Sequence, residues 1–136
     1  MKRNIIAYGF FMLGVVALAL PVSAHHSFSA QYDGSKIVYI SGTMKRVDWS
    51  NPHIHFFVEM TEGDKTTLWT FEGSATTLVE RNGTHRVDLV QNIGKAVTVR
   101  AAPDWKATNR GAAETVKLAD GRELIVGGRR YVGENN

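Results

Sequence analysis

The residues best suited to chemistry in this chain are its five histidines, because the sequence contains no cysteine. Four of them form two clusters: His25 and His26 are adjacent, His53 and His55 are two positions apart, and His85 stands alone. Side chains two apart on a β-strand leave the same face with their β-carbons roughly 6–7 Å apart, so both imidazoles can reach one metal ion. Without thiolates, the ligands must come from imidazole, carboxylate, thioether or the terminal amine. The spacing therefore makes a metal site the leading hypothesis.

The start of the chain decides whether His25 is a terminal residue. Two basic residues, an apolar run over residues 5–20 and small side chains at Val22 and Ala24 are typical of a secretory signal peptide. The alternative is a retained membrane anchor, but the run is shorter than the roughly 20 residues that a spanning helix needs. We expect residues 1–24 to be cleaved after Ala24 and the protein to be exported, to the periplasm or the medium.

Cleavage would leave one domain without a strong charge. Lys+Arg falls from 16 to 14 against 13 Asp+Glu, so the net charge of +3 becomes +1. A balance this close to neutral gives no case for a nucleic-acid partner. No second apolar run follows, so we expect no membrane association after cleavage. We expect an extended arm over residues 25–35, a barrel domain over residues 36–127 and a flexible tail over residues 128–136.

The metal hypothesis centres on the new N-terminus. A terminal His25 chelates through its amine and its Nδ1 atom, and His53 or His55 would add a third nitrogen. Nitrogen-rich, tetragonal sites favour Cu(II), with Zn(II) as the second choice, and His26 and Glu59 are further candidate ligands. Alternatively, His53 bonds its own backbone, His55 is solvated, and the two N-terminal histidines lie on a loose terminus.

The hydrophobic pattern predicts a mainly β domain with one short helix. In residues 53–60, Ile54, Phe56, Val58 and Met60 alternate with polar residues and should face the core. Gly42, inside the first strand pattern, suggests a bulge or a bend. The expected strands cover residues 36–49, 53–60, 66–71, 95–102, 113–118 and 122–126. This order suits a small OB-like Greek-key β-barrel, with a flat hairpin sandwich as the alternative.

The helix is expected over residues 74–81, between the third and fourth strands. Ser74 could cap its N-terminus, and Asn82-Gly83 could end it. The stretch over residues 84–93 fits neither pattern, although Val87 and Leu89 should bury apolar surface together with Val90.

Two other functions compete with metal binding. In the first, the domain is a small-ligand or protein-interaction barrel in which the histidines are incidental. Trp49, Trp69, Phe71 and Trp105 could then form a stacking platform, although Trp69 and Phe71 could equally pack in the core. In the second, the protein is an enzyme such as a copper oxidase. We do not expect an enzyme, because no second catalytic group is evident and no pair of carboxylates is spaced for acid–base chemistry.

Three segments, HHSFSAQYD, VDWSNPHIHFFVE and LWTFEG, carry a resemblance. They resemble a family of small exported bacterial proteins known as domain of unknown function 6152. In that family the mature chain begins with His-His-Ser-Phe, here His25 to Phe28, and contains Trp-x-Asn-Pro-His, here Trp49 to His53. Trp69 and Glu72 match a later motif, and Asp120-Gly121 matches a hairpin turn near the end. The resemblance implies export and a small β-rich body, and it implies no established activity.

Overall fold

The computed structural model describes the backbone of residues 26–128 and the side chains from Phe28 onward. The predicted signal peptide, His25 and residues 129–136 therefore lie outside the described residues. The chain divides into two compact units, residues 1–30 and 31–136. The first described element is helix α2 (His26–Gln31), so the predicted extended arm is wrong there. Among the described residues, no helix is both long enough and apolar enough to cross a membrane.

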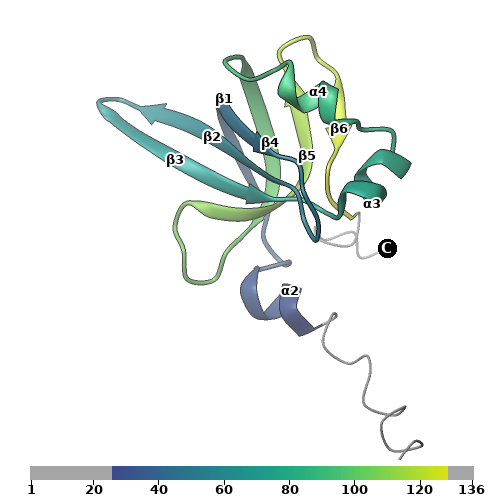
Figure 1. Cartoon of the computed structure of the whole chain (residues 1–136). Helices are drawn as coiled ribbons and strands as arrows, with labels where there is room; N and C mark the ends of the chain where they lie inside the picture. The colour runs from purple at the N-terminus through teal and green to yellow at the C-terminus, as the bar shows by residue number, and fades with distance from the viewer. Residues whose placement is uncertain (1–25, 129–136) are drawn as a thin grey trace, which may run out of the picture. The chain divides into compact units, whose positions relative to one another are not determined.

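A closed β-barrel forms the body of the second unit (Figure 1). The sheet order is β3-β2-β1-β4-β5-β6, and a parallel pairing between β3 and β5 closes the barrel. The strands are β1 (Val38–Asp48), β2 (His55–Glu62), β3 (Lys65–Glu72), β4 (Ala96–Pro103), β5 (Arg110–Leu118) and β6 (Glu123–Ile125). The predicted OB-like barrel is confirmed, since three strands, a helical segment and further strands close in the expected order.

Strand β1 belongs to both halves of the barrel because it changes partners along its length. Its first half pairs with β4 up to Thr43, and its second half pairs with β2 from Thr43 onward. Gly42 lies at the change, where a β-carbon would collide with the carbonyl oxygen of Glu59. Only glycine allows the two backbones to approach this closely. The register irregularity between β1 and β2 lies further along, between Met44 and Arg46, and not at Gly42.

The core fills the barrel with side chains from alternate positions. Ile54, Phe56 and Val58 are fully buried, as the alternation predicts. Phe71 stacks against Phe56, with their ring centroids 5.5 Å apart. Met60, toward the tip of the same strand, is only partly buried and packs against the edge of the core. Strand periodicity therefore identified the core face of β2 correctly.

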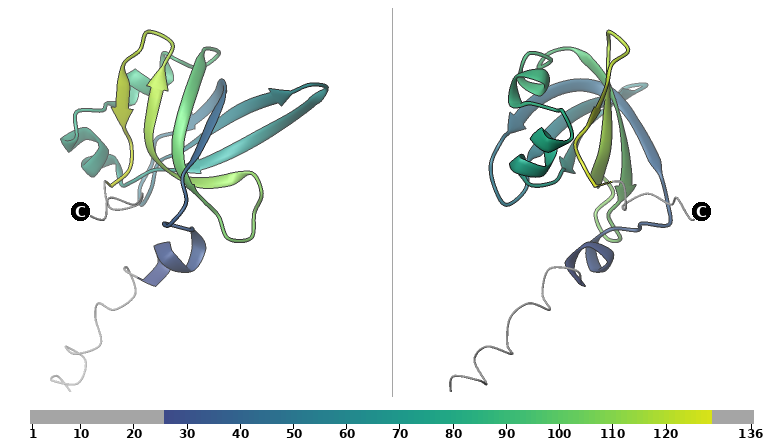
Figure 2. Two further views of the ribbon diagram at one scale, coloured as in Figure 1. Left: turned by 180° about the vertical axis from the view of Figure 1, so that it is seen from behind. Right: turned by 90° about the vertical axis from the view of Figure 1, so that its right-hand side faces the viewer.

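Two short helices, rather than the single one expected, connect β3 to β4: α3 (Thr76–Arg81) and α4 (Arg86–Val90). Both lie beside β6 in the two views of Figure 2. The unassigned stretch is thus largely helical. Leu89 is fully buried as expected, Val90 is partly buried, and Val87 is 62% exposed, so the expectation for Val87 is wrong. A helix of five residues turns only one narrow face toward the core.

The N-terminus of α3 is not capped by Ser74, contrary to expectation. Ala75 occupies the capping position without a side-chain bond. Instead, Asn51 Oδ1 accepts hydrogen bonds from the backbone N–H of Thr76 at 3.2 Å and from its hydroxyl at 2.9 Å. Ser74 is buried, and its backbone bonds to Ile54 and Val126. Asn82 and Gly83 end the helix as predicted, and Gly83 has a φ of 87°.

Candidate functional site

A histidine–carboxylate pair lies where the chain enters β2. His53 follows Pro52 in the loop before the strand, and its Nδ1 atom contacts Oε1 of Glu72, the last residue of β3. The His53 side chain is 48% exposed, whereas that of Glu72 is 19% exposed. When Nδ1 carries the proton of a neutral imidazole and donates it to the carboxylate, Nε2 keeps its lone pair. The pair therefore presents an open nitrogen ligand on a ring that Glu72 orients.

Tyr32 holds the other oxygen of the same carboxylate. Its hydroxyl donates a hydrogen bond of 2.7 Å to Glu72 Oε2, and the tyrosine is buried. Burial, followed by the hydrogen bond to Glu72 and the charge of Glu72, raises the pKa of the Tyr32 phenol well above its ordinary value. The phenol therefore remains a donor over the physiological range. Glu72 is fixed from both sides, by an imidazole and by a phenol.

Asp104, in the loop after β4, and Arg110, the first residue of β5, continue this network behind Tyr32. The Arg110 guanidinium lies 6.0 Å from the centre of the Tyr32 ring and 3.7 Å from a carboxylate oxygen of Asp104. The backbone N–H groups of Lys106 and Ala107 donate to Asp104 at 2.8 and 3.0 Å. The Lys106 N–H is the largest cause that holds the pKa of Asp104 below its ordinary value. These contacts anchor the loop beside the buried phenol.

His55 lies close to the pair but in a different element. It is the first residue of β2, with Asp48 of β1 and Glu72 of β3 as its cross-strand partners. His53 precedes the strand, so the expectation that both histidines belong to one regular strand is wrong. Among the side chains that the structure describes, from Phe28 to residue 128, no three of His, Cys, Asp or Glu are placed to hold a metal ion together. The described part of the chain therefore supplies an oriented imidazole rather than a complete metal site.

The remaining histidines and Glu59 are not part of the His53–Glu72 pair. His25 lies outside the described residues, and His26 begins α2 with a side chain that is also outside them. His85 is the N-cap residue of α4, and its backbone N–H donates to Asp88 Oδ2 at 2.8 Å. Glu59 forms an ion pair of 3.2 Å with Lys45.

Trp49, Trp69, Phe71 and Trp105 do not form a shared stacking platform. Trp69 and Phe71 stack with centroids 5.8 Å apart, and both are buried. Trp49 packs against the core from a partly buried position. Trp105 is 54% exposed in the loop after β4, with Lys36 Nζ 6.0 Å from its ring. Core packing is therefore confirmed for Trp69 and Phe71.

Sequence reasoning missed Tyr32 and Glu72, the two residues that fix His53. They are 40 positions apart, and no local spacing links them. A usable signal was present, because the motif HHSFSAQYD contains Tyr32 and LWTFEG contains Glu72. Both motifs carried the family resemblance, together with the segment that contains His53.

The fold and the site define a small closed β-barrel of OB-like topology with an oriented histidine–carboxylate pair at the start of β2. The chain belongs to a family of unknown function, DUF6152, whose family model matches residues 13–113. No curated protein and no solved structure matches the chain. The family resemblance seen in the sequence is thus confirmed, and the family assigns no activity.

Proposed function

We propose that this protein is an exported metal-binding module, for copper in the first place, in which His53 binds the ion through Nε2. The observation that carries the proposal is the contact between His53 Nδ1 and Glu72. A histidine that binds a metal almost always donates its other ring N–H to a carboxylate, a carbonyl or a water. Such a partner fixes the tautomer and the ring orientation and makes the ligating nitrogen more basic.

Tyr32 strengthens this interpretation because it restrains the carboxylate. A surface ion pair needs no third partner, and most exposed pairs contribute little to stability. Here the second oxygen of Glu72 accepts a hydrogen bond from a buried phenol. Partners of this kind are those whose loss lowers metal affinity by roughly 10–100-fold.

The other ligands are proposed from the sequence. The amine and imidazole of a processed His25 would supply two nitrogens, and His55 and His26 are the next donors. Three nitrogens in a tetragonal arrangement favour Cu(II) over oxygen-preferring ions. Because the ligands must be neutral imidazoles and a deprotonated amine, binding should weaken as the pH falls toward about 5.

The test is a Cu(II) titration of protein recovered from the periplasm or medium of an expressing bacterium. Intact mass must first show that the chain begins at His25. We expect one tightly bound equivalent, with binding lost in His53→Ala and weakened roughly 10–100-fold in Glu72→Gln. His85→Asn is the matched control, because it removes a histidine away from the pair while asparagine retains a capping side chain.

Three outcomes would contradict the proposal. If His53→Ala and His85→Asn bind copper as the unaltered protein does, His53 is not a ligand. If one additional alanine before His25 changes nothing, the terminal amine is not a ligand and the chelate is wrong. Retention of residues 1–24 in the recovered protein would disprove the cleavage on which that chelate depends.

A further inference from the structure

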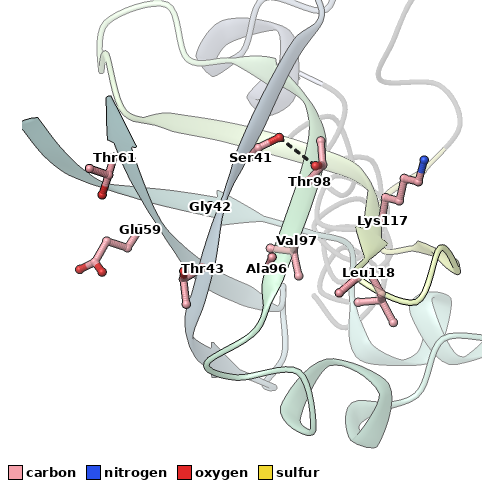
Figure 3. Close-up of a pocket in the computed structure, with 11 residues that line it drawn as sticks. Ser41, Gly42, Thr43, Glu59, Thr61, Ala96, Val97, Thr98, Lys117 and Leu118 are labelled. Carbon is pink, nitrogen blue, oxygen red and sulfur yellow. Dashed lines mark hydrogen bonds between the residues drawn. The ribbon is translucent and has the colours of Figure 1, made fainter. Parts of the chain in front are cut away.

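We propose that an extended segment of a partner protein pairs with the free edge of β1, beside a groove lined by β1, by Glu59 and Thr61 of β2, and by residues of β4 and the end of β5. The groove has a volume of about 540 Å³, within the range of about 300–1,000 Å³ usual for ligand sites. Figure 3 shows Glu59 and Thr61 on one side of β1 and Thr98 and Lys117 on the other. The proposal is independent of the proposed metal site, since the groove contains none of the histidines proposed as ligands and neither Glu72 nor Tyr32.

The groove opens because two paired strands diverge. The β1–β2 ladder stops at Thr43 and Glu59, although both strands continue beyond that point. Val38 to Gly42 pair only with β4, and Met60 to Glu62 pair only with β3. Figure 1 shows the β2–β3 hairpin turning away from β1 and β4. Within residues 31–128, no strand pairs with this edge of β1 between Val38 and Gly42.

The free edge presents regularly spaced backbone donors and acceptors. The N–H and C=O of Met44 both bond on the β4 side, to Lys95 and Gly94. Alternate residues of an antiparallel strand direct these groups to opposite sides, and the β1–β4 register is unbroken from Val38 to Thr43. The N–H and C=O of Tyr39 and Ser41 therefore face the groove. An unpaired row of this kind is a template for another strand.

The missing stretch of ladder defines how the partner would bind. Before Thr43, β2 no longer pairs with β1. A segment that pairs with β1 there would run antiparallel to it and place alternate residues opposite Ser41 and Tyr39. Main-chain bonds would provide affinity, as in other complexes in which a strand is added to a sheet edge. An extended polypeptide carries the matching series of donors and acceptors, which is why we choose it over a sugar or a nucleic acid.

The side chains around the groove describe what the partner should carry. Four lining side chains carry hydroxyl groups, those of Ser41, Thr43, Thr61 and Thr98, and Ser41 and Thr98 are bonded to each other at 2.8 Å. Lys117 lines the groove and forms no ion pair with another residue in the range 31–128. Lys117 lies across β4 from Ser41, so charge complementarity favours a polar segment with an acidic side chain that extends over β1 and β4 toward Lys117.

The experiment selects random seven-residue peptides on the unaltered protein, with Ser41→Pro as the counter-target. Proline removes the Ser41 N–H that faces the groove, and the β4 ladder loses no bond because that N–H does not point toward β4. Ser41→Ala is the matched control, since it removes only the hydroxyl. We expect enriched peptides that bind the protein and Ser41→Ala equally, bind Ser41→Pro at least 10-fold more weakly, and contain an acidic residue.

A second measurement does not depend on the folding of any variant. The selected peptide is synthesised with N-methyl groups either on the residues that should bond β1 or on the alternate residues. We expect the first form to lose binding and the second to retain it, with slowed hydrogen exchange at the Tyr39 and Ser41 amides. Equal binding of the two forms, or no sequence enriched over the counter-target, would overturn the proposal. So would a concentration-dependent dimer that protects the same amides, because a second copy would then occupy the edge.

Discussion

The two ends of strand β2 differ in the kind of chemistry that they offer. At His55, β2 pairs with both neighbours, Asp48 on β1 and Glu72 on β3. At Glu62, its other end, it pairs with β3 alone. Where the ladder is complete, the backbone N–H and C=O groups already bond to neighbouring strands. Function must then come from side chains, as in the His53–Glu72 pair. Where the ladder opens, backbone groups become available to a partner.

The two ends of β2 also differ in the contacts that stabilise them. Glu72 is fixed by a buried phenol and follows a core residue directly in sequence. The groove is lined by hydroxyl, small apolar and charged side chains, and β1 approaches the backbone of β2 closely at Gly42. Four substitutions test how much each region depends on the contacts that stabilise it.

The largest effect should come from Phe71→Ala, which removes the core beneath the closed end. Phe71 is fully buried and stacks on both Phe56 and Trp69. Replacing it with alanine should lower the free energy of unfolding by about 3–5 kcal/mol, measured by urea denaturation. Leu68→Ala on the same strand is the control, because Leu68 is 46% exposed. Similar losses from the two variants would contradict the core assignment.

Gly42→Ala should have the next largest effect, because it acts where the strands diverge. Its new β-carbon would meet the carbonyl of Glu59 and force the two backbones apart. We expect a loss of about 1–3 kcal/mol and faster hydrogen exchange near Glu59. Ser41→Ala, one residue away and facing outward, should change stability little. An unaltered unfolding curve for Gly42→Ala would mean that the close approach is not needed.

Tyr32→Phe tests whether the hydrogen bond from Tyr32 to Glu72 stabilises the end of β2 at which the ladder is complete. The variant leaves a half-buried carboxylate oxygen without its donor, and we expect a loss of about 1–2 kcal/mol near neutral pH. The folded-state pKa of Tyr32 is raised above its ordinary 10.0. The phenol therefore contributes its full stability below pH 10.0 and loses that contribution as the pH rises above this value. Denaturation between neutral pH and about pH 11 should show a steeper alkaline decline in the unaltered protein than in Tyr32→Phe.

Asp104→Asn should have the smallest effect, limited to acidic pH. The pKa of Asp104 is held below its ordinary 3.8, chiefly by the N–H of Lys106. Its contribution is therefore present above pH 3.8 and is lost as the pH falls below it. The asparagine variant should show a flatter acid decline, measured by thermal unfolding from about pH 5 to 2. Parallel acid declines would show that the anchored loop adds nothing to stability.

Local patterns predicted the elements and missed the contacts between them. Alternation identified Ile54, Phe56 and Val58 as the core face because a strand repeats every two residues. Ser74 matched a capping residue by type, yet Asn51 caps α3 from 25 positions away. The short helix α4 carries too few apolar positions for a clear period.

The sequence alone determined the barrel, the paired histidines and the family, because each depends on local periodicity, turn chemistry or a contiguous motif. Only the tertiary structure decided that Glu72 and Tyr32 orient His53, that His55 begins a separate element, and that β1 and β2 diverge beyond Thr43. These features join residues far apart along the chain, and their geometry is set by how the closed sheet twists and packs.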